Sequence, residues 1–248
     1  MSTRKRHKKI ETFALQEGRK LGSHYEVIRR LGGGTEGEVY QVREVDTGIL
    51  RAAKLYFPHV DPKKKQGPWH ARKLHRLRHC EIVLQYHHTQ AVTIARESVL
   101  CLISDLSEGD TLDRWVAAQP GGRLTPFIAL HVLYALARGI EPIHAVPDYH
   151  SDVHTENILV RPLGVNFDIK LIDFYDWGRF ARYKQQQDIL HTVRVFYDIL
   201  GGRRFYPRLA PELKYIVGGL QHKIILKRFP TMSELRLHLE TFAWTSLR

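Results

Sequence analysis

The chain has 248 residues, of which 43% are hydrophobic and 26% are charged. It is long enough to bury a core, and this size predicts one domain or two closely packed lobes. The longest apolar stretch runs from Ile128 to Ala137 and is interrupted by His131, so it is too short to span a bilayer.

The formal net charge is +12, which predicts attraction to polyanions such as nucleic acid, anionic lipid or acidic proteins. A charge run is usually a solvated face, so a specific acidic or nucleic-acid partner is the weaker interpretation. The two cysteines, Cys80 and Cys101, provide neither a disulfide framework nor a zinc cluster. The basic N-terminus lacks the apolar core of a secretory signal, and a cytoplasmic location is expected.

The predicted elements fall into three parts along the chain. Residues 1–22 form a basic arm, expected to be flexible or to form a peripheral helix. Residues 23–106 begin with two strand-like runs around the glycine cluster GGGTEG, followed by the strand ILRAAKLYF. A helix over HARKLHRLRH follows, and then three strand-like runs, VLQYHH, AVTIARE and SVLCLISDL.

Residues 107–248 have mainly helical patterns. The expected helices cover TLDRWVAA, PFIALHVLYALARGIEPIHAV, DILHTVRVFYDIL, PELKYIVGGL and TMSELRLHLETF. A strand-rich first third followed by a helix-rich remainder predicts the α+β class with two lobes, divided near residue 107.

The first motif with chemical content is the cluster Gly32, Gly34 and Gly37. Alone it is a weak signal, because glycine clusters mark turns in many folds. A dinucleotide-binding fold would place a helix after it, whereas EVYQV is a strand pattern, so a strand–turn–strand flap over phosphates is favoured. Lys54 lies in the apolar strand RAAKLY, where it either meets an anion or extends to water.

A more specific motif is YHSDVHTENILV, in which Asp152 and Asn157 lie five residues apart on a polar loop between a long helix and a strand. Sixteen residues after Asn157, Asp173 ends the apolar run KLID. A carboxylate at a strand end can reach a metal ion that bridges phosphates.

Taken together, these motifs resemble those of the eukaryotic-type Ser/Thr protein kinase superfamily, over about residues 25–245. The resemblance implies a bilobal fold, with a small β-rich N-lobe and a larger helical C-lobe, and the use of ATP and Mg²⁺. It implies that Asp152 orients the attacking hydroxyl and accepts its proton, that Lys54 holds the α- and β-phosphates, and that Asn157 and Asp173 bind magnesium. The nucleotide would be bound by Leu31, Gly32, Gly34, Gly37, Val39, Ala52, Lys54, Asp105, Ser107 and Leu159, with Ser104 as gatekeeper.

The sequence departs from the family pattern at several positions. His70 stands where the family has the glutamate that pairs with the strand lysine, and Tyr175 replaces the glycine two residues after Asp173. Asp188 follows Asp173 by only fifteen positions, too few for the usual activation loop. Ala210-Pro211-Glu212 imitates the motif that ends that loop, but an ordinary helix start is favoured there.

These departures leave three functional hypotheses. The first is an atypical, active Ser/Thr protein kinase with a minimal activation segment and protein substrates. The second is a small-molecule kinase, because His154, two residues after Asp152, also resembles the pattern of aminoglycoside and choline phosphotransferases. The third is a nucleotide-binding pseudokinase that acts through its basic surface, motivated by His70 and by the net charge of +12.

Overall fold

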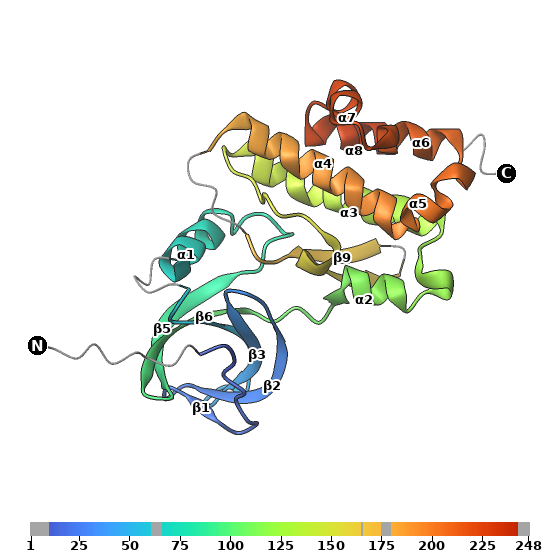
Figure 1. The fold of residues 1–248 in the computed structure, drawn as a ribbon. Coiled ribbons are helices and arrows are strands. Elements are labelled where there is room, and N and C mark those ends of the chain that lie inside the picture. Colours follow the sequence, from blue (N-terminus) through green and yellow to red (C-terminus); the bar gives the residue numbers. More distant parts are fainter. Residues whose placement is uncertain (1–9, 61–65, 165, 175–179, 243–248) are drawn as a thin grey trace, which may run out of the picture. The chain divides into compact units, whose positions relative to one another are not determined.

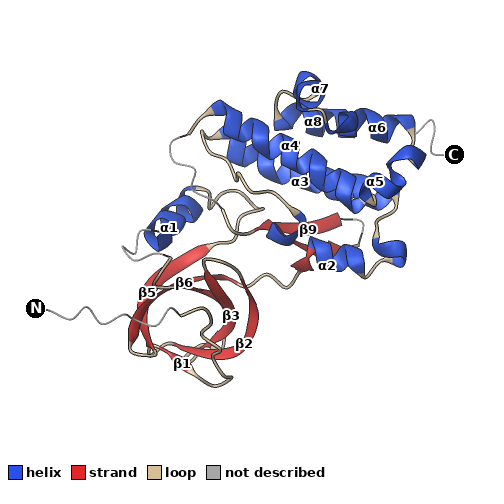
Figure 2. Ribbon diagram, in the orientation of Figure 1, coloured by secondary structure: helices blue, strands red, loops and turns tan. Residues whose placement is uncertain are grey.

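The computed structural model describes residues 10–60, 66–164, 166–174 and 180–242 (Figure 1). It divides into two compact units. The first comprises Met1–Arg78 and Leu84–Ser107, and the second comprises His79–Val83 and Glu108–Arg248. Strands dominate the described part of the first unit and helices that of the second (Figure 2), which confirms the predicted α+β class.

The first unit is built on a six-stranded antiparallel sheet with the order β1-β2-β3-β4-β6-β5. The strands are β1 (Lys20–Leu21), β2 (Tyr25–Gly33), β3 (Gly37–Glu44), β4 (Leu50–Tyr56), β5 (Tyr86–Ile94) and β6 (Glu97–Asp105). Two of the expected strand-like runs, VLQYHH and AVTIARE, form the single strand β5. The prediction of separate strands was wrong because β5 pairs with β6 along its whole length, through one register shift between Tyr86 and His88.

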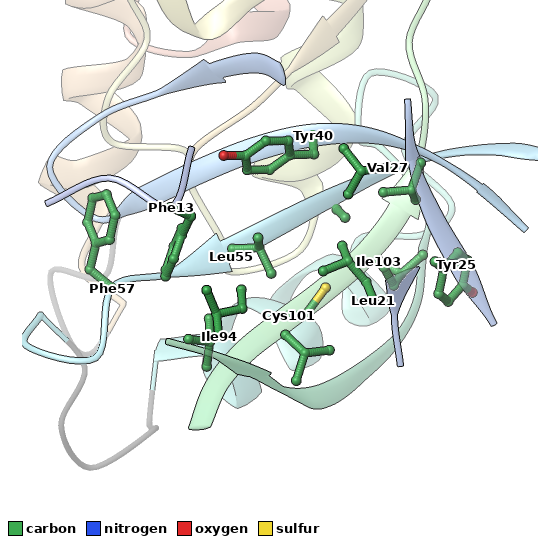
Figure 3. Packing of buried hydrophobic residues seen from close by; sticks show 14 residues of the cluster. Phe13, Leu21, Tyr25, Val27, Tyr40, Leu55, Phe57, Ile94, Cys101 and Ile103 are labelled. Carbon is green, nitrogen blue, oxygen red and sulfur yellow. The ribbon is translucent and has the colours of Figure 1, made fainter. Parts of the chain in front are cut away.

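The two faces of this sheet have different neighbours. One face buries the alternating side chains of Ala53 and Leu55 in β4 and of Cys101 and Ile103 in β6 (Figure 3). The other face, where Tyr56 and Leu102 are buried, packs against Ala71 and Leu74 of helix α1 (Gln66–Arg76). Lys54 alternates with the buried apolar residues of β4 and therefore points to the α1 face.

The segment from residue 10 to residue 22 is not a free arm, so this part of the prediction was wrong. Phe13 is buried in the core, with its ring centroid 5.1 Å from that of Phe57 (Figure 3). Thr12 Oγ1 and the backbone N–H of Phe13 donate hydrogen bonds of 2.8 Å and 3.0 Å to the buried carboxylate of Glu38. The segment is held because the carboxylate requires these donors once it is out of water. Residues 1–9 of the predicted arm lie outside the described residues.

The second unit is mainly helical, with a small sheet in the order β7-β8-β9. In Figure 1 the long helices α3 and α4 lie side by side, and α3 also packs against α8. The strands are β7 (Asp110–Thr111), β8 (Ile158–Leu163) and β9 (Asn166–Leu171). The α-helices are α2 (Leu112–Ala117), α3 (Pro126–Ala145), α4 (Arg182–Ile199), α5 (Gly202–Phe205), α6 (Pro211–Val217), α7 (His222–Arg228) and α8 (Met232–Glu240). Short 3-10 helices occupy η1 (Pro120–Gly122), η2 (Thr155–Asn157), η3 (Tyr206–Arg208) and η4 (Gly218–Leu220).

Three boundaries in this unit bear on the sequence predictions. Helix α4 begins at Arg182, so Asp188 lies inside the helix rather than at its start. Pro211 occupies the first turn of α6, which confirms the predicted helix start. His79–Val83 belongs to this unit, although the sequence placed it with the strands, because the N–H of Leu171 donates to the carbonyl of Ile82 at 2.8 Å.

Among the described residues, no helix is both long and apolar enough to cross a bilayer.

Replacing Phe13 by alanine is expected to destabilise the protein by about 3 kcal/mol, because a buried aromatic ring is lost and a cavity is left. Urea unfolding followed by circular dichroism measures the effect. The matched control is Phe127→Ala, since Phe127 is 58% exposed and its loss is expected to change stability by less than about 0.5 kcal/mol. Equal stability of the Phe13→Ala and wild-type proteins would show that the segment does not contribute to the core.

Candidate active site

The glycine-rich turn joins β2 to β3, and its glycines have different structural roles. A Cβ atom on Gly37 would lie 1.9 Å from the carbonyl oxygen of Leu55, so the approach of β3 to β4 requires glycine there. At Gly32 and Gly34 a Cβ atom would meet no atom of the described residues within 4 Å. Internal packing therefore does not explain these two glycines, and they leave room for a ligand to approach the backbone. Leu31, just before them, is partly buried.

Lys54 lies on β4, opposite Val39 of β3. Its Nζ atom is 3.0 Å from Oε2 of Glu36, and the two side chains are only 16% and 24% exposed. The ammonium also lies 5.3 Å from the ring centroid of Tyr56. Lys54 is thus paired with an anion of its own unit rather than extended into water.

Helix α1 provides no carboxylate for Lys54, since its sequence contains no acidic residue. His70, the residue aligned with the family's helix glutamate, is buried, and its Nδ1 atom is 2.8 Å from the hydroxyl of Tyr56. Glu36 was not among the residues predicted from the sequence motifs. The available signal was an acidic residue inside the glycine-rich turn itself, between Gly34 and Gly37.

The predicted adenine-binding residues of the first unit are carried on β3, β4 and β6. Ala52 pairs with Ser104, and each is only 8% exposed. The backbone N–H of Asp105 donates to the carbonyl of Gln85 at 2.9 Å. The carbonyl of Asp105 accepts from Ser104 Oγ at 3.3 Å, and its second lone pair could accept from a ligand. The carboxylate of Asp105 accepts hydrogen bonds from Arg51 at 2.8 Å and His87 at 2.7 Å, and Ser107 follows at the end of the unit.

In the second unit, the structure brings Asp152 and Asn157 together. The Nδ2 atom of Asn157 donates to the backbone oxygen of Asp152 at 3.0 Å and to its Oδ2 atom at 3.1 Å. Because Nδ2 is used in this way, the amide oxygen of Asn157 is the atom left for a metal ion. The Asp152 side chain is 47% exposed, which leaves the carboxylate accessible to an acceptor, and His154 Nε2 lies 3.5 Å from its Oδ2 atom.

His150 fixes the backbone on both sides of this loop. Its Nδ1 atom accepts from the N–H of Asp152 at 3.2 Å, and its Nε2 atom donates to the carbonyl of Ile172 at 2.9 Å. This pattern requires the neutral tautomer with the proton on Nε2. The ring of Phe174 packs against the imidazole, with the centroids 4.3 Å apart.

Asp188 of α4 is fully buried and binds the backbone of the same loop. Its carboxylate accepts hydrogen bonds from the N–H groups of His150 at 2.7 Å and Ser151 at 2.6 Å, and from His144 Nε2 at 3.0 Å. Burial raises the pKa of Asp188, but the hydrogen bonds that its carboxylate accepts from His144 and from the backbone of His150 outweigh this effect and leave the pKa lowered. Ser151 has a φ of 74°, a left-handed conformation that these bonds help to maintain.

Asp173 lies two residues beyond β9 and is exposed, with a φ of 57°. Antiparallel pairing of Ile158 with Leu171, and the hydrogen bond from the N–H of Ile172 to the carbonyl of Asn157, place Asp173 at the same end of the ladder as Asn157. Leu159, the predicted adenine contact of this unit, pairs with Lys170 and is partly buried. A carboxylate and an amide oxygen are ligands that suit Mg²⁺. Tyr175 lies outside the described residues.

This fold, with its glycine-rich turn, strand lysine and hydrogen-bonded Asp152–Asn157 loop, is the protein kinase fold. The family described as "Protein kinase domain" matches residues 25–213, and the chain belongs to that family.

Among its relatives, CBL-interacting protein kinase 11 of Oryza sativa subsp. japonica is 28% identical over 184 residues, which are 72% of this chain and 34% of that protein. Serine/threonine-protein kinase pkn2 of Myxococcus xanthus is 28% identical over 222 residues, 85% of this chain and 25% of that protein. The matched region thus spans about a third or less of these relatives. The crystal structure of the Mycobacterium tuberculosis PknI kinase domain superposes with a TM-score of 0.61 at 19% identity, covering 93% of this chain and 100% of that one.

Replacing Asp188 by asparagine is expected to destabilise the second unit by about 3 kcal/mol at neutral pH, because buried donors lose their charged acceptor. The folded-state pKa of Asp188 is lower than the ordinary value of 3.8, so its contribution is complete above that value and is lost as the pH falls through the folded-state value. Unfolding free energies from urea titrations at several pH values should therefore converge for the two proteins in acid. A difference that does not depend on pH would contradict the assignment.

Proposed function

We propose that the chain is an ATP- and Mg²⁺-dependent phosphotransferase, specifically an atypical Ser/Thr protein kinase that acts on protein hydroxyl groups. The observation that carries the proposal is the loop in which Asn157 fixes the Asp152 carboxylate while His150 and Asp188 hold its backbone. Family membership supports the class of reaction, and the Ser/Thr kinases among the relatives support the protein substrate.

The residues present fit both cofactors. The open space at Gly32 and Gly34 and the ammonium of Lys54 are suited to bind phosphates, and the oxygen atoms of Asn157 and Asp173 are suited to bind magnesium. Leu31, Val39, Ala52 and Leu159 would contact the adenine ring, and the backbone of Asp105 and Ser107 would form hydrogen bonds with it. When bound, magnesium would neutralise charge on the phosphate oxygens.

In the proposed reaction, Asp152 orients the acceptor hydroxyl and takes its proton. The hydroxyl oxygen forms a bond to the γ-phosphorus of ATP while the bond from that phosphorus to the β–γ bridging oxygen breaks, and ADP leaves. The hydrogen bond from Asn157 keeps Oδ2 of Asp152 in place, so the chain contributes mainly positioning and charge.

The proposal includes a minimal activation segment. Helix α4 begins at Arg182, and only seven residues, 175–181, separate Phe174 from it. A segment of this length leaves little room for a phosphorylated loop. Ser151 fits this interpretation, because it stands where many regulated kinases carry an arginine that grips such a phosphate. The catalytic loop is instead held internally, by Asp188.

A small-molecule acceptor is the second candidate. It is favoured by His154, whose Nε2 lies 3.5 Å from the Asp152 carboxylate, and by the short segment after Phe174. The ion pair of Lys54 with Glu36 argues against a pseudokinase, because it provides Lys54 with the carboxylate partner that His70 cannot supply. Comparing labelled-phosphate transfer into a mixed protein pool with transfer into a pool of hydroxylated metabolites distinguishes the two acceptor classes.

Replacing Asp152 by alanine is expected to reduce phosphotransfer by about 100-fold or more, because the general base and the orienting group for the acceptor are both lost. The assay measures transfer from γ-labelled ATP to casein and to the protein itself. Asp198→Asn is the matched control, since Asp198 is a surface aspartate paired with Arg194. Full activity of Asp152→Ala would refute the proposed role.

Replacing Asp173 by alanine is expected to remove the magnesium dependence of nucleotide binding. In the wild-type protein, ATP with magnesium should raise the melting temperature more than ATP with a chelator, because ligand binding stabilises the folded state by mass action. In Asp173→Ala the two conditions should give the same melting temperature. A magnesium effect equal to that of the wild-type protein would exclude Asp173 as a ligand.

A further inference from the structure

The carboxylate of Glu36 lies against Lys54, the residue proposed to bind the nucleotide phosphates. Glu36 Oε2 and Lys54 Nζ are 3.0 Å apart, and each side chain is more than three-quarters buried. Two charges at this separation attract each other more strongly here than at an open surface, because little water lies around them to screen the interaction.

Both partners of this ion pair are fixed to the same antiparallel ladder. The N–H of Phe57 donates to the carbonyl of Glu36 at 2.9 Å, which continues the pairing of Gly37 with Tyr56 and of Val39 with Lys54. The N–H of Gly34 donates to the carbonyl of Gly37 at 2.9 Å and closes the turn. Glu36 is therefore anchored next to the strand that carries Lys54.

The turn is also held close to β4. A Cβ atom on Gly37 would lie 1.9 Å from the carbonyl oxygen of Leu55, so the backbone beside Glu36 approaches β4 as closely as only glycine allows. A carboxylate on a backbone anchored in this way is suited to orient a neighbouring ammonium, because little conformational freedom is left to lose when the two groups meet.

Helix α1 is not equipped for this task. It contains no acidic residue, and His70 directs Nδ1 to the Tyr56 hydroxyl at 2.8 Å. Lys73, one turn further on, is a buried cation whose ammonium lies 5.1 Å from the ring centroid of Trp69. Helix α1 therefore carries no carboxylate that could balance the charge of Lys54.

We propose that Glu36 is the positioning carboxylate of Lys54, which it holds in the orientation needed to align the bound nucleotide phosphates for transfer. This inference rests on the proposed phosphotransferase function. The orientation of Lys54 is then built into the sheet and does not depend on the position of α1.

The test compares Glu36→Gln and Glu36→Asp with the wild-type protein. Glu36→Gln is expected to lower the maximal rate of phosphotransfer at saturating ATP by about 10- to 100-fold. The dissociation constant for ATP should change by no more than about 3-fold, because Lys54 keeps its positive charge and loses only its fixed orientation. Glu36→Asp, which keeps the carboxylate, should recover part of that rate. A purely structural role would not produce this separation of rate from affinity, nor this recovery.

A second readout is independent of catalysis. Only the unprotonated amine reacts with an N-hydroxysuccinimide ester, and a neighbouring carboxylate favours the protonated form. Labelling of Lys54, followed by peptide mass spectrometry, should therefore be about 5-fold faster or more in Glu36→Gln than in the wild-type protein. Glu141→Gln is the matched control, because the Glu141–Arg236 pair has similar burial, with side chains 28% and 22% exposed. This control should leave both the transfer rate and the Lys54 labelling unchanged.

Three results would overturn the proposal. They are wild-type phosphotransfer by Glu36→Gln, unchanged labelling of Lys54, and tighter ATP binding with faster transfer, which would identify Glu36 as a competitor for the phosphate site. If the wild-type protein transfers no more phosphate than Asp152→Ala, the proposed function fails by itself. The labelling comparison then still decides whether Glu36 holds Lys54.

Discussion

The loop that carries the proposed base, Asp152, depends on one buried carboxylate. The Asp188 carboxylate accepts hydrogen bonds from the backbone N–H groups of two consecutive loop residues and from the ring N–H of His144. These donors take the place of water around the buried negative charge. These bonds hold Ser151 in a left-handed conformation that a serine rarely adopts. Asp152, the next residue, therefore presents its carboxylate from a backbone that helix α4 fixes.

The ring of His150 extends this constraint to the end of β9. One ring nitrogen accepts from the backbone of Asp152 and the other donates to the backbone of Ile172, next to Asp173. The proposed base and the proposed metal ligand are thus linked through one imidazole. Asp188 and His150 thus hold the loop that carries Asp152 within the second unit.

The first unit also contains a largely buried carboxylate, which here forms an ion pair with a lysine of the same unit. Lys54 lies on β4, and Glu36 lies in the turn just before β3, where the N–H of Phe57 holds its carbonyl beside β4. Glu38, two residues further on, uses its carboxylate differently, to hold residues 12 and 13 onto the sheet. Two acidic residues on either side of Gly37 therefore serve the candidate site and the core, respectively.

The α+β class, and the choice of Lys54, Asp152, Asn157 and Asp173 as candidate site residues, could be inferred from the amino-acid sequence alone. These inferences depend on local order, because the period of apolar residues and the spacing of motifs are properties of the chain and do not require knowledge of distant contacts. Helix α6 was predicted for the same reason, from Pro211 and Glu212 at its first turn.

The contacts between residues that lie far apart in the sequence could be recognised only in the folded chain. Phe13 enters the core because Phe57 and Glu38, more than twenty residues away, offer it an apolar neighbour and a hydrogen-bond acceptor. Likewise, Glu36 could be recognised as the partner of Lys54 only when the pairing of β3 with β4 was known, since register between strands is set by packing across the sheet. The helix that the family pattern indicated as the source of that carboxylate offers His70 instead, and its imidazole is bound to Tyr56.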